Sequence, residues 1–196
     1  AFHFTSGYVA PYIEIGSFFK DQKMEQGVAN VGIGYFTNLL NISKSWKIRQ
    51  FAFVNVTYGF NRFPIEKINI NNVNGLKGFK ADSVVGSNKM VLGTQTTIYT
   101  PWYLLGFRFA PIFYFGIGMI GDDQKPFFLD SAYPVIGVGL NIRNEYLIFN
   151  TFQISLGFYP YIPNQGLGIF KLNPLNNNDF QIRDYELGKP GQVAYY

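Results

Sequence analysis

The residues that could do chemistry in this chain are few and widely spaced. The chain has no cysteine and a single histidine, His3, which excludes thiol chemistry, a histidine-based metal site and a Ser-His-Asp triad within it. Aspartates in the segment 121–131 lack the glycine-punctuated spacing of a calcium-binding EF-hand loop, so a solvated loop is the simpler interpretation. Asp184 and Glu186 share a face of a predicted strand without an acid/base partner. The sequence therefore predicts no catalytic site, no metal site and no cofactor.

The most distinctive stretch is a glycine-punctuated motif, Gly75-Leu76-Lys77-Gly78-Phe79. It lies within a long polar segment, about residues 63–88, with strand-like runs on both sides. One interpretation takes Gly75 and Gly78 as ordinary turn glycines and Lys77 as a solvated lysine. Any further role for the motif depends on the elements that would hold it.

Those elements are predicted to be β-strands, because apolar and polar residues alternate with a period of two along most of the chain. The clearest run is 104–120, where apolar residues from Leu105 to Met119 form one row, while glycines, Arg108 and Tyr114 belong to the other. Such a row is longer than an ordinary strand of a soluble sheet. Eight runs are predicted, at about residues 7–19, 27–40, 46–62, 89–100, 104–120, 133–143, 147–159 and 180–196.

The composition indicates a sheet that contacts lipid. Aromatic residues make up 19% of the chain and charged residues only 14%, against about 25% charged residues in a typical soluble domain. No apolar run approaches the roughly 18 to 20 residues of a transmembrane helix. The net charge of +4 comes without a run of like charges, which predicts no nucleic-acid partner.

The connections between the predicted strands alternate in length, apart from a modest first loop. Short turns on one side and long loops on the other are typical of outer-membrane barrels. We therefore predict an all-β, transmembrane antiparallel β-barrel over residues 1–196, located in a bacterial outer membrane with its lipid as a partner. The short connections are 41–45, 100–103 and 144–146, and the long ones are 63–88, 121–132 and 160–179.

The motif and the strands after it resemble one family of barrels. The stretch from Asn74 to Phe79, followed by about a dozen residues and a strand ending in proline, is similar to the Val/Ile-Arg-Gly-Phe/Tyr loop of BamA-type assembly and secretion barrels, the bacterial surface-antigen superfamily. The stretch 136–140, Ile-Gly-Val-Gly-Leu, resembles the Gly-x-Gly-Leu of that family's antepenultimate strand. The stretch from Asp184 to Pro190 most resembles Bacteroidota members.

The resemblance implies a fold and a set of contacts. The chain would cover the last eight strands of a sixteen-stranded barrel, and the loop of about 63–88 would fold back into the lumen. The family's arginine, which pairs with acidic groups on the wall, is Lys77 here, and lysine cannot form the same bidentate fork. Gly116 takes the place of one of the acidic groups. The wall expected to face the motif comprises Gln95, Arg108, Tyr114 and Gly116, and the expected C-terminal assembly signal is Tyr195 and Tyr196.

Three functions fit this pattern. The resemblance implies a barrel that inserts polypeptide cargo into the membrane or passes it through a lateral seam. A second function is a barrel that anchors or exports an enzyme domain, phosphoesterase- or lipase-like, outside this chain, as in several Bacteroidota members. A third is a self-contained eight-stranded barrel with a structural or binding role. In the first two, the remaining N-terminal part of the protein or a partner chain completes the barrel. In none is the chain itself an enzyme.

Overall fold

The structure is a computed structural model that describes residues 2–20, 23–63, 67–71, 75–122, 132–144 and 152–175 of the 196. These residues form antiparallel strands joined by turns, which confirms the predicted all-β class. No helix among them is long and apolar enough to cross a membrane.

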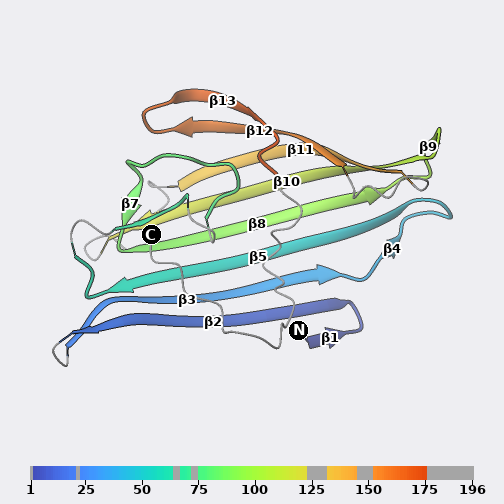
Figure 1. Ribbon diagram of the computed structural model, residues 1–196. Helices are drawn as coiled ribbons and strands as arrows, with labels where there is room; N and C mark the ends of the chain where they lie inside the picture. Colours follow the sequence, from blue (N-terminus) through green and yellow to red (C-terminus); the bar gives the residue numbers. More distant parts are fainter. Residues whose placement is uncertain are drawn as a thin grey trace.

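One sheet contains eleven of the strands and extends from β1 at one edge to β13 at the other (Figure 1). Its order is β1-β2-β3-β5-β8-β10-β11-β12-β13, with β4 paired to β5 and β9 paired to β10, while β6 and β7 form a separate ladder. Within the described residues the sheet is therefore open. The strands are β1 (Phe2–Phe4), β2 (Gly7–Lys20), β3 (Lys23–Thr37), β4 (Leu40–Asn41), β5 (Lys47–Phe60), β6 (Ile68–Asn69), β7 (Val85–Gly86), β8 (Asn88–Tyr99), β9 (Tyr103–Leu104), β10 (Phe107–Gly121), β11 (Ala132–Asn144), β12 (Phe152–Ile162) and β13 (Gly166–Leu172).

Seven of the eight predicted strands correspond to β2, β3, β5, β8, β10, β11 and β12, with ends shifted by a few residues. The predicted loop over 160–179 is wrong in part, because β13 lies within it and pairs with β12. Glycines occupy two of the seven positions of β13, and Lys171 stands on its inner face, so its apolar alternation is weak in the sequence. The predicted eighth strand, 180–196, lies outside the described residues.

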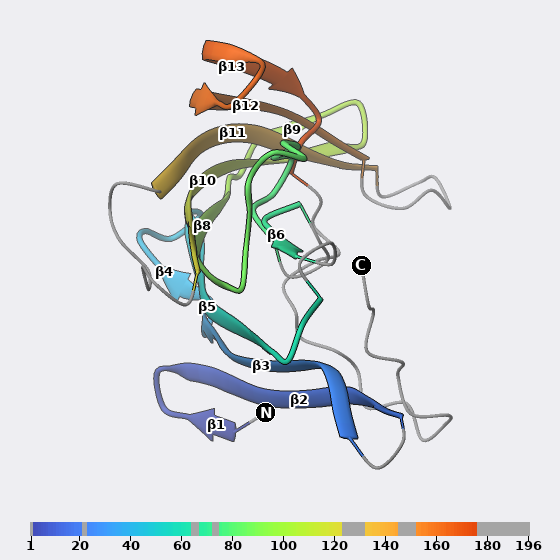
Figure 2. The same cartoon turned by 90° about the vertical axis from the view of Figure 1, so that its left-hand side faces the viewer.

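The sheet is curved, and its two faces differ (Figure 2). The inner face is the concave side of the sheet, and the outer face is the convex side (Figure 2). On β10, Ile112 and Tyr114 are buried on the inner face, where Tyr114 belongs to the core cluster, whereas Phe113 and Phe115 alternate with them on the outer face and are about half exposed. The alternation predicted from the sequence is therefore present. Exposed apolar residues continue on the outer face across the sheet as Ile13, Ile15, Val31, Ile33, Val54, Tyr58, Ile136, Val138, Ile154, Leu156, Phe170 and Leu172.

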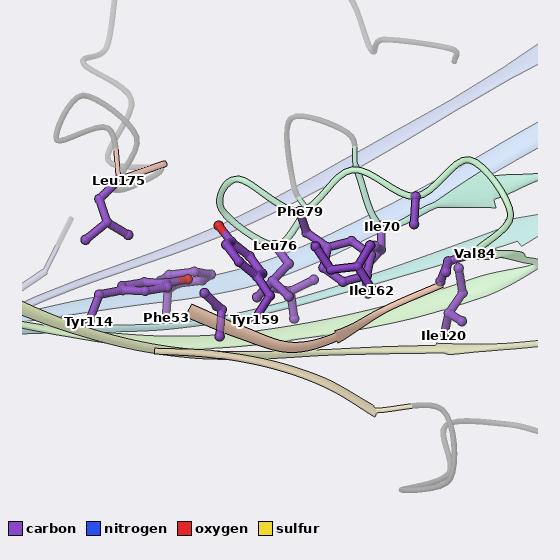
Figure 3. Packing of buried hydrophobic residues seen from close by; sticks show 13 residues of the cluster. Phe53, Ile70, Leu76, Phe79, Val84, Tyr114, Ile120, Tyr159, Ile162 and Leu175 are labelled. Atoms are coloured by element: carbon purple, nitrogen blue, oxygen red, sulfur yellow. The ribbon is translucent and has the colours of Figure 1, made fainter. Parts of the chain in front are cut away.

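The described residues 67–71 and 75–87, between β5 and β8, lie on the inner face (Figure 2) and together are called the segment 67–87. Its side chains Ile70, Leu76 and Phe79 are buried in one cluster with Tyr114 of β10 and Tyr159 of β12 (Figure 3). The hydrophobic core of the described chain therefore lies between this segment and the sheet.

Glycines on the inner face of β10 allow this close approach. A Cβ atom at position 118 would collide with the Cδ1 atom of Ile70, and one at position 116 would lie 3.0 Å from the Cδ1 atom of Leu76. Because protein interiors are close-packed, a larger residue at either position would push the segment away from the strand.

We expect Gly118→Ala to destabilise the docked segment by about 1 to 3 kcal/mol, the range for overpacking a core. Ile70→Val removes the Cδ1 atom that the new methyl group would meet, so the double variant should lose less stability than the sum of the two single variants. Denaturant titration of the full chain in lipid vesicles measures both effects. Strictly additive losses would contradict the contact between Ile70 and β10.

Candidate functional site

The candidate site is the segment 67–87 where it meets β8, β10 and β12, and hydrogen bonds within the segment give it a defined shape. The Oδ1 atom of Asn71 accepts the N–H of Ala81 at 2.9 Å, and its Nδ2 atom donates to Asp82 Oδ1 at 3.3 Å. The N–H of Leu76 donates to the carbonyl of Ile70 at 3.0 Å. Asn71 thus ties the two sides of the segment together around the motif.

The motif itself makes a tight turn whose apolar side chains point into the sheet. The N–H of Phe79 donates to the carbonyl of Leu76 at 3.1 Å, and both side chains are buried. The Phe79 ring lies 5.2 Å from the Tyr133 ring and 6.3 Å from the Tyr159 ring, measured between centroids. Gly78 has a φ angle of 67°, and a Cβ atom there would collide with the Tyr159 hydroxyl, so the turn requires glycine.

Backbone carbonyls of the motif accept hydrogen bonds from the C-terminal strands. The Tyr159 hydroxyl donates to the carbonyl of Lys77 at 2.7 Å, and Lys171 Nζ donates to the carbonyl of Gly78 at 3.2 Å. The Nε2 atom of Gln165 donates to the carbonyl of Lys80 at 2.7 Å. These bonds do not depend on the side chains of the residues that accept them.

Two of the predicted wall residues, Tyr114 and Gly116, lie directly at the motif. The Nζ atom of Lys77 stands 5.4 Å from the centroid of the Tyr114 ring, a cation–π contact. Leu76 and the Tyr114 hydroxyl fill the space beside Gly116, where the resemblance implies an acidic side chain. Gln95 is buried on β8 and is the Cα partner of Tyr114 in the ladder.

Arg108 lies elsewhere than predicted. It is near the start of β10, six residues before Tyr114, and is exposed, with its guanidinium 5.8 Å from the centroid of the Tyr103 ring. At about 3.3 Å per strand residue it is roughly 20 Å along the strand from the Lys77–Tyr114 contact. The expectation that Arg108 faces the motif is therefore wrong. Asn74, Tyr195 and Tyr196, which the resemblance also singled out, lie outside the described residues.

Sequence reasoning missed the residues that hold the motif from the opposite side. Tyr159 was assigned only as the end of a strand, while Gln165 and Lys171 fell in the predicted loop. In the sequence, Asn71 is one of several asparagines in a polar segment, and nothing distinguishes it from the others. An inward tyrosine among the small residues Ser155 and Gly157 was the one available signal, since a buried tyrosine hydroxyl usually has a partner.

The half of the inner face formed by β2, β3 and β5 carries a polar network. Asn55 is fully buried, and its Nδ2 atom donates to Asn30 Oδ1 at 2.8 Å and also contacts the Tyr12 hydroxyl. Asn30 donates through its own Nδ2 atom to Glu14 Oε2 at 3.2 Å, and the Thr57 hydroxyl donates to Asn30 Oδ1 at 3.2 Å. The inner face thus has a polar half beside the half that the segment 67–87 covers.

Comparison with protein-family models, with curated proteins and with solved structures finds no match for this chain. The resemblance to BamA-type barrels therefore stays a prediction from the sequence.

We expect apolar burial to hold the motif more strongly than the charge of Lys77 does. Phe79→Ala should cost about 3 to 5 kcal/mol, as for other buried phenylalanines, whereas Lys77→Ala removes a cation–π contact of about 0.5 to 1 kcal/mol and leaves the carbonyl that Tyr159 binds. Denaturant titrations of both variants in lipid vesicles compare the losses directly. Equal losses would indicate that the lysine charge is the main attachment.

Proposed function

We propose that this chain is part of the wall of an outer-membrane β-barrel that inserts polypeptide into the membrane or translocates it. The apolar outer face carries the proposal. Exposed large apolar side chains extend over β2, β3, β5, β10, β11, β12 and β13, whereas an ordinary soluble surface has patches of only a few hundred Å². A lipid bilayer would bury the exposed apolar side chains of all these strands together.

Two tryptophans at one end of the strands also support a position in a membrane. Trp46 directly follows the short connection 41–45, and Trp102 lies within the short connection 100–103; their ring centroids are 5.6 Å apart in an edge-on arrangement. Tryptophan is enriched at membrane–water interfaces because it combines an apolar ring with a hydrogen-bond donor. In the proposed barrel this end marks the boundary of the apolar layer on the side of the short turns.

Polar side chains on the outer face are paired with one another. The side-chain amide of Gln50 bonds with the hydroxyls of Thr94 and Thr96, and the Thr94 hydroxyl also donates to the carbonyl of Phe51 at 3.0 Å. The backbone N–H of Gln50 donates to Thr37 Oγ1 at 3.0 Å. Polar groups that face lipid must find partners within the protein, and this cluster meets that requirement.

The inner face supports a role with polypeptide. Its polar half presents the partly exposed hydroxyl of Tyr12 and carboxylate of Glu14, which suit a water-filled passage along the wall, while the amide of Asn30, which donates to Glu14, is buried. The segment 67–87 occupies the other half, as the loop of BamA-type barrels does in the lumen. The proposed barrel thus offers a passage beside a docked loop, with its outer face in lipid.

Phe113→Arg tests the membrane assignment. Phe113 is half exposed near the middle of β10, so arginine there should cost about 2 to 4 kcal/mol of folding free energy in lipid. Leu105→Arg is the matched control, because Leu105 is 85% exposed in the turn before β10, where the cost should be about 0 to 1 kcal/mol. Equal costs for the two variants would exclude a lipid-facing β10.

Reconstitution tests the proposed activity. The full-length protein in lipid vesicles should speed the folding of an unfolded outer-membrane polypeptide to its protease-protected form, relative to empty vesicles. Glu14→Trp narrows the polar half and should slow this reaction, whereas Ile15→Trp, on the exposed outer face of the same strand, should not. A folding rate no higher than that with empty vesicles would contradict the handling of polypeptide and would favour a barrel with an anchoring or structural role.

A further inference from the structure

We propose that a hollow between the segment 75–83 and the turn 163–165 binds an anionic group, a phosphate or a carboxylate carried by a polar ligand. This proposal does not rest on the proposed handling of polypeptide. It concerns the side of the motif that borders the turn between β12 and β13, where Lys77 and Lys80 line the hollow and Lys171 of β13 binds the carbonyl of Gly78.

The hollow has a volume of about 820 Å³ and two rims from distant parts of the chain. One rim is the motif and the residues after it, and the other is the turn between β12 and β13. The hydrogen bond from Gln165 Nε2 to the carbonyl of Lys80, 2.7 Å long, connects the two rims. The volume falls within the roughly 300 to 1,000 Å³ of small-molecule sites, and the connection gives the hollow a defined shape without any ligand.

Positive charge predominates around the hollow. Lys77 and Lys80 line it, and Asp82 is the one carboxylate among the described residues that do so. Asp82 already accepts a hydrogen bond from Asn71 at 3.3 Å. The ammonium group of Lys171 donates to the carbonyl of Gly78, a residue of the rim, and so adds a third positive charge next to the hollow.

Neutral polar side chains complete the lining. Ser83, Asn164 and Gln165 are exposed around the hollow and provide hydroxyl and amide donors and acceptors. Lysines act as point charges that do not demand the planar geometry of a carboxylate, so they bind phosphate and carboxylate oxygens alike. The expected ligand therefore combines one anionic group with hydroxyl or amide groups.

Lys80→Gln is the decisive variant. Lys80 is exposed, and the substitution keeps the backbone carbonyl that Gln165 binds, so both rims stay in place. Lys44→Gln is the matched control, because Lys44 is an equally exposed lysine in the turn between β4 and β5, outside the hollow. Both variants lower the net charge by one, which separates a local site from a general attraction of anions.

Isothermal titration calorimetry of the full chain in detergent micelles measures binding of two probes, inorganic pyrophosphate and citrate, at low salt. We expect saturable binding of at least one probe, weakened at least tenfold by Lys80→Gln and not by Lys44→Gln, and weakened further by added sodium chloride. The stronger probe identifies phosphate or carboxylate as the preferred group. Absence of binding by the unsubstituted chain, or equal weakening by the two variants, would overturn the proposal.

Discussion

The structure depends on covering the apolar part of the sheet's inner face. Val91, Tyr114 and Tyr159 point to the concave side, and the segment 67–87 buries them with Leu76 and Phe79. Burying one such apolar side chain contributes about 1.5 to 3 kcal/mol, while each hydrogen bond to a backbone carbonyl contributes about 0.5 to 1.5 kcal/mol. Apolar burial therefore supplies most of the stability of the docked segment. The bonds from Tyr159, Gln165 and Lys171 determine where along the strands it sits.

Apolar side chains on the two faces of the sheet are covered in different ways. On the inner face the chain supplies its own cover over one half and pairs its polar side chains with one another on the other half. On the outer face, residues such as Ile13 and Ile15 are about 70% exposed, and the described residues supply no cover for them. That face needs a cover along strands from β2 to β13, and in the proposed barrel lipid supplies it. This requirement is what favours lipid over a single protein partner.

The sequence alone predicted much of the fold but little of the site. Alternation along a strand depends on a single period, so β10 and its outward row could be located from residues 104–120. The site depends on contacts between residues some eighty positions apart, such as the bond from Tyr159 to Lys77, and no local pattern encodes them. The sequence did not predict β13, because glycines interrupt its alternation of apolar residues. It placed Arg108 at the motif because alternation shows which face of a strand a residue lies on, but not how far along the strand it lies from another residue.

The resemblance to BamA-type barrels implies an arginine at position 77 and an acidic side chain at position 116, where this chain has Lys77 and Gly116, and the packing around the motif bears on both differences. An acidic side chain at position 116 would need the space that Leu76 and the Tyr114 hydroxyl occupy. Apolar contacts hold the motif at that point, and the residue at position 77 contributes its carbonyl to Tyr159 whatever its side chain. A lysine can then turn toward the Tyr114 ring and line the hollow. Gly78 has no such freedom, because its positive φ angle and the Tyr159 hydroxyl exclude any side chain.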